Sequence, residues 1–193
     1  MSESWDDYAD DWDLNPDVIR YADNAYETLI REIDLAGLNI LDFGCGTGSL
    51  AKKMAAIAAQ VVAIDKSAKM IKVLAAKKIN NIEALDLDIC KANLKSVPAF
   101  RRKFDLVTAS SVFSFVADYH ATLSIIKKHL APNGRLVQWD WYSDGTGNGF
   151  TTQMIETAYQ EAGFSSLKIE KAFDLTSERG TMSVIMAIAS PQF

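Results

Sequence analysis

The sequence predicts an α/β fold in which a mostly parallel sheet of seven strands is flanked by helices and ends in an antiparallel C-terminal hairpin. Short apolar runs alternate with longer segments whose apolar residues recur at helical spacing, which is the pattern of repeated βαβ units. A glycine-rich loop follows the first of these runs. The last two runs are separated only by residues 173–181, which is too short for the crossover that parallel strands require.

Residues 1–36 are expected to form an acidic, aromatic segment followed by a helix. Asn15 provides a capping side chain, and Pro16 suits the first helical position because its missing N–H has no helical partner there. Apolar residues then recur at helical spacing from Val18 to Ile33.

The remaining residues, 37–193, are expected to form the alternating core. Strands are expected at 38–43, 60–64, 82–87, 104–109, 135–139, 167–172 and 182–189. Ser67 is expected to cap one intervening helix and Gly163 to end another. Residues 130–134 predict a helix stop and a turn, because Asn133 and Gly134 tolerate positive φ. No repeat or linker interrupts the chain, so residues 1–193 are expected to form a single domain.

Composition narrows the class of protein. The chain has 193 residues, of which 49% are hydrophobic and 23% charged, as in globular proteins. Its net charge of −5 makes nucleic acid an improbable partner, because phosphate binding relies on Lys and Arg. The acidic start is unlike a secretory signal, and no apolar window reaches the roughly 20 residues of a membrane span, so a cytoplasmic location without membrane association is expected.

The cysteine and histidine residues suggest neither a disulfide framework nor a metal site. Two cysteines and two histidines lie far apart in the sequence, without the spacing of zinc ligands. We therefore expect no metal, and the oligomeric state stays open.

The strongest motif is a loop with glycines at alternate positions, Gly44, Gly46 and Gly48, between a strand and a helix. Glycine permits a tight turn and close approach of a ligand, and the helix N-terminus favours an anionic group such as a carboxylate. The third glycine of the dinucleotide pattern G-x-G-x-x-G would fall at Ser49. The loop also lacks the Gly-Lys-Ser/Thr ending of a phosphate-binding loop.

Acidic residues end the next two expected strands. Asp65 lies about 20 residues beyond the first glycine, where nucleotide-binding α/β folds place the carboxylate that accepts from ribose hydroxyls. Asp88 ends the third strand, although Asp86 competes for the same role.

With these residues identified, the chain resembles the class I S-adenosylmethionine-dependent methyltransferases over residues 38–189. The resemblance rests on the glycine loop, the Asp65-Lys66-Ser67 and Asp88-Ile89 sequences, the strand at 104–107, the turn at 130–134 and the terminal hairpin. Asn133 departs from the glycine that is usual in the family. The resemblance implies a Rossmann-like sheet, S-adenosylmethionine as cofactor and S-adenosylhomocysteine as product.

The resemblance also implies a set of cofactor-binding residues. Asp42 would lie near the ammonium group, the three glycines around the methionine part, Asp65 at the ribose, Lys66 and Met70 beside the adenine, Asp88 at the adenine amine, Ile89 beside the ring and Ser110 near the transferable methyl.

The expected acceptor site is aromatic. Ligands of open α/β sheets bind beyond the carboxyl ends of the strands, and the segments expected there carry Tyr8, Trp12, Phe113, Asp140, Trp141 and Tyr142. Tyr8 and Trp12 resemble the N-terminal lid of the family. Aromatic walls suit a planar or apolar acceptor, although these side chains could equally cover the end of the sheet. No catalytic residue is assigned.

The sequence therefore predicts an enzyme that transfers a methyl group from S-adenosylmethionine to a small molecule. A non-catalytic cofactor-binding or scaffold protein, or a protein methyltransferase, would carry the same motifs. A nicotinamide-dependent oxidoreductase is disfavoured by Ser49 and by the terminal hairpin.

Overall fold

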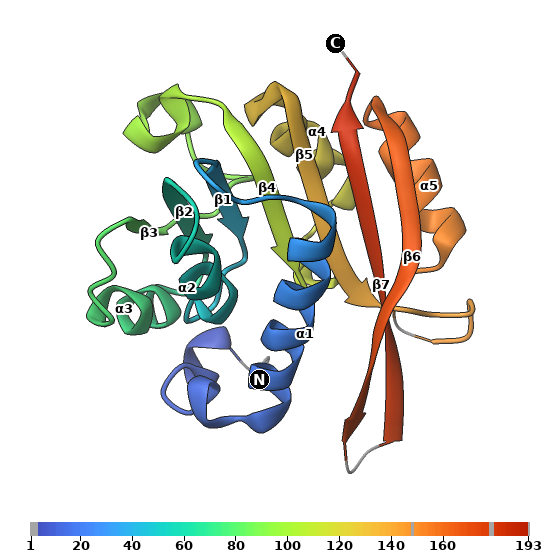
Figure 1. Cartoon of the computed structure of the whole chain (residues 1–193), viewed down its shortest axis with the longest axis horizontal. Coiled ribbons are helices and arrows are strands. Elements are labelled where there is room, and N and C mark those ends of the chain that lie inside the picture. The colour runs from blue at the N-terminus through green and yellow to red at the C-terminus, as the bar shows by residue number, and fades with distance from the viewer. Residues whose placement is uncertain (1–3, 148, 178–179, 193) are drawn as a thin grey trace. The chain divides into compact units, whose positions relative to one another are not determined.

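The structure, a computed structural model, describes residues 4–147, 149–177 and 180–192. The chain divides into two compact units, residues 1–88 and 89–193, which we describe separately. The strands have the predicted number and directions, so the fold class is confirmed: a seven-stranded, mostly parallel sheet with an antiparallel C-terminal hairpin and flanking helices (Figure 1).

The first unit is a three-stranded parallel sheet with strand order β3-β2-β1. Its elements are η1 (Trp5–Tyr8), η2 (Trp12–Leu14), α1 (Pro16–Glu32), β1 (Asn39–Phe43), α2 (Ser49–Ala55), β2 (Gln60–Asp65), α3 (Ala68–Ala76) and β3 (Ile82–Asp86). The predicted caps are confirmed: the Asn15 side chain accepts from the Asp17 amide, and Ser67 accepts from the Met70 amide. Asp65 and Asp86 are register partners, so both acids lie at the carboxyl edge of this sheet.

The second unit has strand order β4-β5-β7-β6. Its elements are η3 (Leu94–Ser96), η4 (Pro98–Arg101), β4 (Phe104–Ser110), η5 (Phe113–Phe115), α4 (Tyr119–His129), β5 (Leu130–Trp141), α5 (Thr152–Glu161), β6 (Phe164–Ser177) and β7 (Gly180–Pro191). Strands β4 and β5 are parallel, whereas β7 is antiparallel to both β5 and β6. Figure 1 shows the β6–β7 hairpin reaching past the end of β5.

Two sequence predictions need correction in this unit. The helix stops at His129 as predicted, but residues 130–134 belong to β5 and shift its register, and neither Asn133 nor Gly134 has a positive φ. Glycine is needed at 134 for space, since a Cβ there would lie 2.8 Å from the Phe104 carbonyl oxygen. The connection expected at 173–181 is mostly paired strand, with Phe173 opposite Val184 and Ser177 opposite Gly180, and residues 178–179 lie outside the described residues.

The cores consist of the inward faces of these elements. Large side chains that are fully buried include Leu29, Leu41, Ile64 and Met70 in the first unit and Phe104, Trp139 and Tyr159 in the second. Among the helices that the structure describes, none combines the length and the apolar character needed to cross a bilayer.

Candidate cofactor and acceptor sites

The glycine loop turns the chain between β1 and α2. The amides of Gly44 and Cys45 donate to the Ile64 carbonyl at 2.9 and 3.0 Å, which ties the loop to β2. Gly46 and Gly48 have φ of +54° and +84°, in the left-handed region that side chains disfavour. A Cβ on Gly48 would lie 2.3 Å from the Leu74 Cδ1 atom, so glycine here also allows α2 to pack closely on α3.

The carboxylate of Asp65 clamps this loop. Its Oδ2 atom accepts from the Gly46 amide and its Oδ1 atom from the Ser67 amide, both at 2.9 Å. Bonds to a charged acceptor are stronger than neutral ones, and each carboxylate oxygen has a second acceptor position. Asp65 therefore orders the loop and can still accept from further donors, such as a ribose diol.

The other predicted cofactor residues of the first unit differ in exposure. Lys66 is exposed and Asp88 is half-buried, whereas Asp42 and Met70 are only 1% and 2% exposed. The second unit contains Ile89, which is 3% exposed, and Ser110, which is half-buried at the end of β4. Their contacts to a cofactor stay a prediction.

The segment 4–14, which we call the N-terminal segment, is attached to the glycine loop through Asp13. The Asp13 carboxylate accepts from the Thr47 hydroxyl at 2.5 Å and pairs with the Lys77 ammonium at 2.6 Å. Lys77 also donates to the Thr47 carbonyl at 2.8 Å. Burial alone would raise the pKa of Asp13, but the hydrogen bonds from Lys77 and Thr47 outweigh it and lower the pKa below its usual value.

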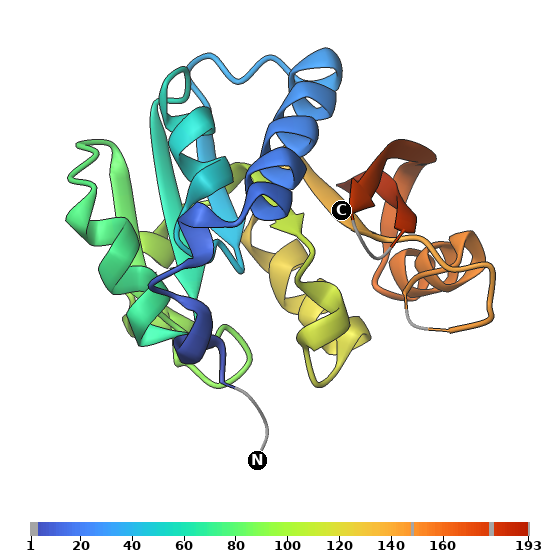
Figure 2. The same ribbon diagram turned by 90° about the horizontal axis from the view of Figure 1, so that it is seen from below.

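Further contacts hold the N-terminal segment at the carboxyl edge of the first unit. Asp6 accepts from the Ser67 hydroxyl at 2.5 Å, which lowers the pKa of Asp6. The indole nitrogen of Trp12 lies 3.4 Å from the position that a Cβ on Gly46 would take. Tyr8 and Trp12 pack edge to face, with ring centroids 6.5 Å apart. Figures 1 and 2 show this segment beside α3.

Sequence reasoning missed the polar contacts of this segment. The acidic character of residues 1–13 was visible, but the partners Thr47, Ser67 and Lys77 lie more than thirty positions away from their acids. Only the folded chain brings them together.

The predicted acceptor residues of the second unit gather around the end of β5. Phe113 is buried and 2% exposed, Trp141 is half-buried, and Tyr142 is 47% exposed. Ser111, between β4 and η5, has a φ of +52°, which is uncommon for a residue with a side chain and often accompanies functional turns.

Asp140 is fully buried within a polar cluster. Its Oδ2 atom accepts from the Gln138 side-chain nitrogen at 3.0 Å. The Tyr119 and Tyr159 hydroxyls both donate to the Gln138 side-chain oxygen, at 2.6 and 3.1 Å. Burial raises the pKa of Asp140 to about 8, although hydrogen bonding from Gln138 and Ser114 opposes the rise. Burial likewise raises the pKa of both tyrosines.

The partners of Asp140 were also missed. Gln138 lies two positions before Asp140 and therefore shares its face of β5, which strand alternation could have indicated. The two tyrosines come from α4 and α5, and no sequence signal linked them to this strand.

The first unit fits the adenosine cofactor that the resemblance implies. Positive-φ glycines leave the loop backbone without a Cβ, and Asp65 presents its carboxylate at the carboxyl end of β2. This is the position where parallel α/β folds hold a ribose.

Comparison with known proteins places the chain among methyltransferases. A family model described as a methyltransferase domain matches residues 41–138, just over half of the chain. The ubiquinone biosynthesis O-methyltransferase of Xanthomonas oryzae pv. oryzae (strain PXO99A) is 33% identical over 106 residues, which cover 54% of this chain and 43% of the relative. The chain spans about half the length of the relatives it matches, from 40% to 56%.

Solved structures show the same fold over nearly the whole chain. The DhpI–SAM–HEP complex has a TM-score of 0.75 at 18% identity and covers 97% of this chain and 94% of its own. Magnesium protoporphyrin IX methyltransferase from Synechocystis PCC 6803 with bound SAM has a TM-score of 0.68 at 20% identity, covering 90% and 80%. The likeness supports the Rossmann-like architecture that the sequence predicts.

Proposed function

This chain belongs to the class I S-adenosylmethionine-dependent methyltransferase family, and we propose that it transfers the methyl group of S-adenosylmethionine to a small-molecule acceptor. The observation that carries the proposal is the Asp65 clamp. The Asp65 carboxylate accepts from the Gly46 amide and from the Ser67 amide at the start of α3. At the end of β2, it would be suited to accept from the two ribose hydroxyls. S-adenosylmethionine supplies an electrophilic methyl on a sulfonium, so the protein provides binding, orientation and proton handling.

Each predicted residue of the first unit would contact a different part of the cofactor. Gly44, Gly46 and Gly48 receive the methionine part, Asp65 accepts from the ribose, and Lys66, Met70 and Asp88 lie toward the adenine. Ile89 and Ser110 complete the predicted set from the second unit. Asp42, buried at the end of β1, is suited to the cationic ammonium group.

A small-molecule acceptor is supported by the relatives. The Xanthomonas relative is named for ubiquinone biosynthesis, and the Synechocystis neighbour for magnesium protoporphyrin IX. The aromatic residues at the end of β5, Phe113, Trp141 and Tyr142, suit a planar acceptor. Tyr8 and Trp12 of the N-terminal segment would shield the cofactor from water.

The cofactor assignment is tested by removing the Asp65 carboxylate. We expect Asp65→Ala to weaken S-adenosylmethionine binding about ten- to hundredfold, the effect of losing hydrogen bonds of about 1.5–3 kcal/mol to a charged group. Because an acid at this position repels a 2′-phosphate, NADP should not compete. Isothermal titration calorimetry measures both, with Glu83→Ala as the control, since Glu83 lies in β3 away from the carboxyl end of the strand. Equal affinity in the wild type and Asp65→Ala would refute the assignment.

Turnover separates an enzyme from a binding protein of the same fold. We expect the wild type to release S-adenosylhomocysteine when hydroxylated aromatic metabolites are supplied. Tight cofactor binding with no release across metabolites and protein extracts would favour a scaffold, and release only with protein would favour a protein methyltransferase.

A further inference from the structure

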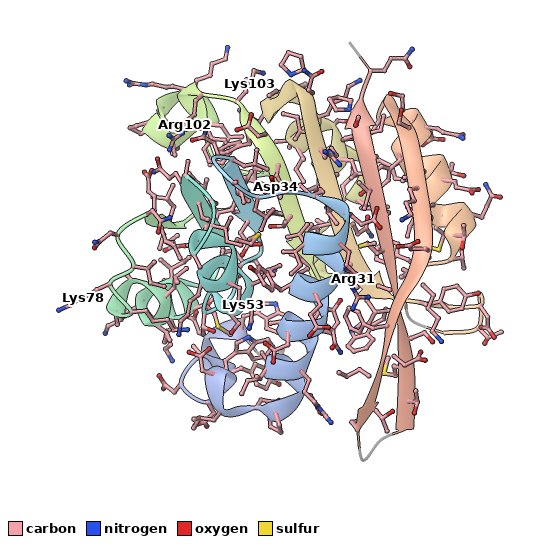
Figure 3. All side chains as sticks on the ribbon, viewed as in Figure 1. Arg31, Asp34, Lys53, Lys78, Arg102 and Lys103 are labelled. Carbon is pink, nitrogen blue, oxygen red and sulfur yellow. The ribbon has the colours of Figure 1, made fainter. Side chains whose placement is uncertain are left out.

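Lys77, the residue that follows α3, joins two separate segments of the first unit through its ammonium group. The Nζ atom donates to the Thr47 carbonyl oxygen at 2.8 Å and pairs with the Asp13 carboxylate at 2.6 Å. The Lys77 side chain is only 23% exposed, whereas the next residue, Lys78, is exposed and points outward (Figure 3). Lysine is rarely buried unless its charge is paired, so these two contacts account for the position of Lys77.

Thr47 is the residue on which these contacts converge. It is fully buried in the glycine loop, where its hydroxyl donates to Asp13 Oδ1 at 2.5 Å while its carbonyl accepts from Lys77. Lys77, Asp13 and Thr47 therefore form a closed triangle of three contacts. The N-terminal segment, the glycine loop and the end of α3 meet in this triangle.

The local sequence does not fix Thr47 by itself. This residue lies between Gly46 and Gly48, which have φ of +54° and +84°, and glycine loses more conformational freedom on ordering than any other residue. Asp65 holds the Gly46 amide from the side of β2, and the triangle restrains Thr47 from the side of α3. A loop that is ordered in advance loses less entropy when a ligand binds, which raises the affinity.

Lys77 also acts on the charge balance of the loop. Burial raises the pKa of the Cys45 thiol, and Asp42 and Asp65 raise it further, whereas Lys77 lowers it. The Asp13 carboxylate is itself only 36% exposed. Because a partly buried carboxylate is costly without its charged partner, removal of the ammonium favours release of Asp13 from the loop.

Release of Asp13 changes what lies against the loop. The indole nitrogen of Trp12, the preceding residue, lies 3.4 Å from the position that a Cβ on Gly46 would take. Trp5 packs edge to face on Trp12, with ring centroids 5.8 Å apart. The position of the N-terminal segment and the conformation of the loop therefore depend on each other.

We propose that Lys77 is a positioning residue of the cofactor site: together with Asp13, it sets the conformation of the glycine loop at Thr47 and couples that conformation to docking of the N-terminal segment. This inference rests on the proposed function, and it requires no contact between Lys77 and the cofactor. Because coupling between two binding events is reciprocal, the cofactor stabilises the docked segment by the same factor by which the docked segment tightens cofactor binding.

Calorimetry with S-adenosylhomocysteine tests the effect on affinity. We expect Lys77→Met, which keeps the length of the side chain but removes its charge, to weaken binding about five- to fiftyfold. Lys77→Arg keeps a cation with several donors and should restore most of the affinity. Lys72→Met is the matched control, because it removes the same charge from an exposed position of α3 and should change binding little. Equal losses at positions 72 and 77 would assign the effect to net charge and overturn the proposal.

Asp13→Asn tests the triangle from its other side. We expect the losses from Asp13→Asn and Lys77→Met to be non-additive, so that the double variant binds no more weakly than the weaker of the two single variants. Additive losses would contradict a shared triangle. Denaturant unfolding of each variant checks that it is folded, and Asp13→Asn retains the test if Lys77→Met does not fold.

Amide hydrogen exchange over residues 4–14 measures the reciprocal effect and does not depend on turnover. Saturating S-adenosylhomocysteine should slow exchange in the wild type and Lys72→Met, and much less in Lys77→Met. A purely structural role for Lys77 would lower the free energy of unfolding but leave this protection unchanged, and that result would overturn the proposal. Equal affinity in the wild type and Lys77→Met would overturn it too, whereas a wild type that does not bind S-adenosylhomocysteine would refute the proposed function itself.

Discussion

Asp65 and Asp140 show how one residue type takes different roles in different surroundings. Asp65, half-buried at the end of β2, accepts two backbone amides and holds the glycine loop. Asp140, fully buried in β5, accepts from the Gln138 side chain and from Ser114. Burial in the second environment favours the protonated carboxyl and raises the pKa of Asp140.

The raised pKa of Asp140 also predicts how stability changes with pH. An ordinary aspartate ionises near pH 4, whereas the folded chain keeps Asp140 protonated until about pH 8, so between these values the folded state binds more protons. Stability therefore falls as pH rises through this window. Asp140→Asn removes the titration, and we expect it to gain stability relative to wild type from pH 5 to pH 9, by several kcal/mol at most.

Denaturant unfolding at several pH values measures this difference. Asp174→Asn is the control, because Asp174 is exposed and hydrogen bonds from Lys171 and Ser183 lower its pKa. The same pH trend in both variants would mean that Asp140 is not the source.

We expect a side chain at Gly48 to lower the free energy of unfolding by more than backbone strain alone, because Leu74 lies against this position. Gly37 and Gly48 both have positive φ, +74° and +84°, but a Cβ on Gly37 would meet nothing within 4 Å. We expect Gly37→Ala to cost about 1 kcal/mol of unfolding free energy and Gly48→Ala about 1–3 kcal/mol more, because the new methyl overlaps Leu74. Adding Leu74→Ala to Gly48→Ala should reduce the additional loss. Equal costs at the two glycines would show that Leu74 adjusts freely.

At the scale of elements, two acidic residues attach the N-terminal segment to the rest of the first unit. Asp13 contacts the glycine loop and Lys77, while Asp6 contacts Ser67 at the start of α3. Both acids have a lowered pKa, so their contribution is present above about pH 4 and is lost as the pH falls through the lowered value. Exposed pairs contribute little to global stability, and we therefore expect local release of the segment without unfolding of the unit.

Truncation tests whether the N-terminal segment contributes to ligand binding. Removing residues 1–14 retains Asn15, which caps α1, so the remaining chain should still unfold cooperatively. We expect the truncated protein to bind S-adenosylmethionine or the acceptor more weakly, because Tyr8 and Trp12 no longer cover the site. Calorimetry measures ligand binding, and limited proteolysis measures whether the truncated chain stays folded. The variant Asp13→Asn should expose the N-terminal segment to protease while keeping Tyr8 and Trp12. Unchanged binding after truncation would limit the segment to a structural cover.

At the scale of the whole molecule, the charge predicts weak binding to nucleic acid. The chain carries 20 basic and 25 acidic side chains. Figure 3 shows that its basic groups come from separate elements, with Lys53 on α2, Lys78 after α3, and Arg102 and Lys103 before β4. We expect weak affinity for duplex DNA at physiological salt, measured by fluorescence anisotropy. Tight binding with a steep salt dependence would contradict this.

The sequence by itself determined how strands and helices alternate along the chain. It also determined the caps at Asn15 and Ser67, the glycine loop and the antiparallel direction of the terminal hairpin. These features depend on local preferences: apolar periodicity, capping side chains, positive φ and the minimum length of a crossover. The hairpin shows the limit of such reasoning, because polar residues such as Asp174 were expected in a connection but pair across strands in β6. Tertiary pairing overrides the local preference there.

Only the tertiary structure decided which distant side chains meet. The Asp13–Lys77 pair and the support of Asp140 by Gln138, Tyr119 and Tyr159 join residues from separate elements. A side chain's partner and burial, and therefore its pKa, depend on how the elements pack. The sequence could name Asp140 as a candidate acceptor residue, but the burial that raises the pKa of its carboxyl depends on the folded chain.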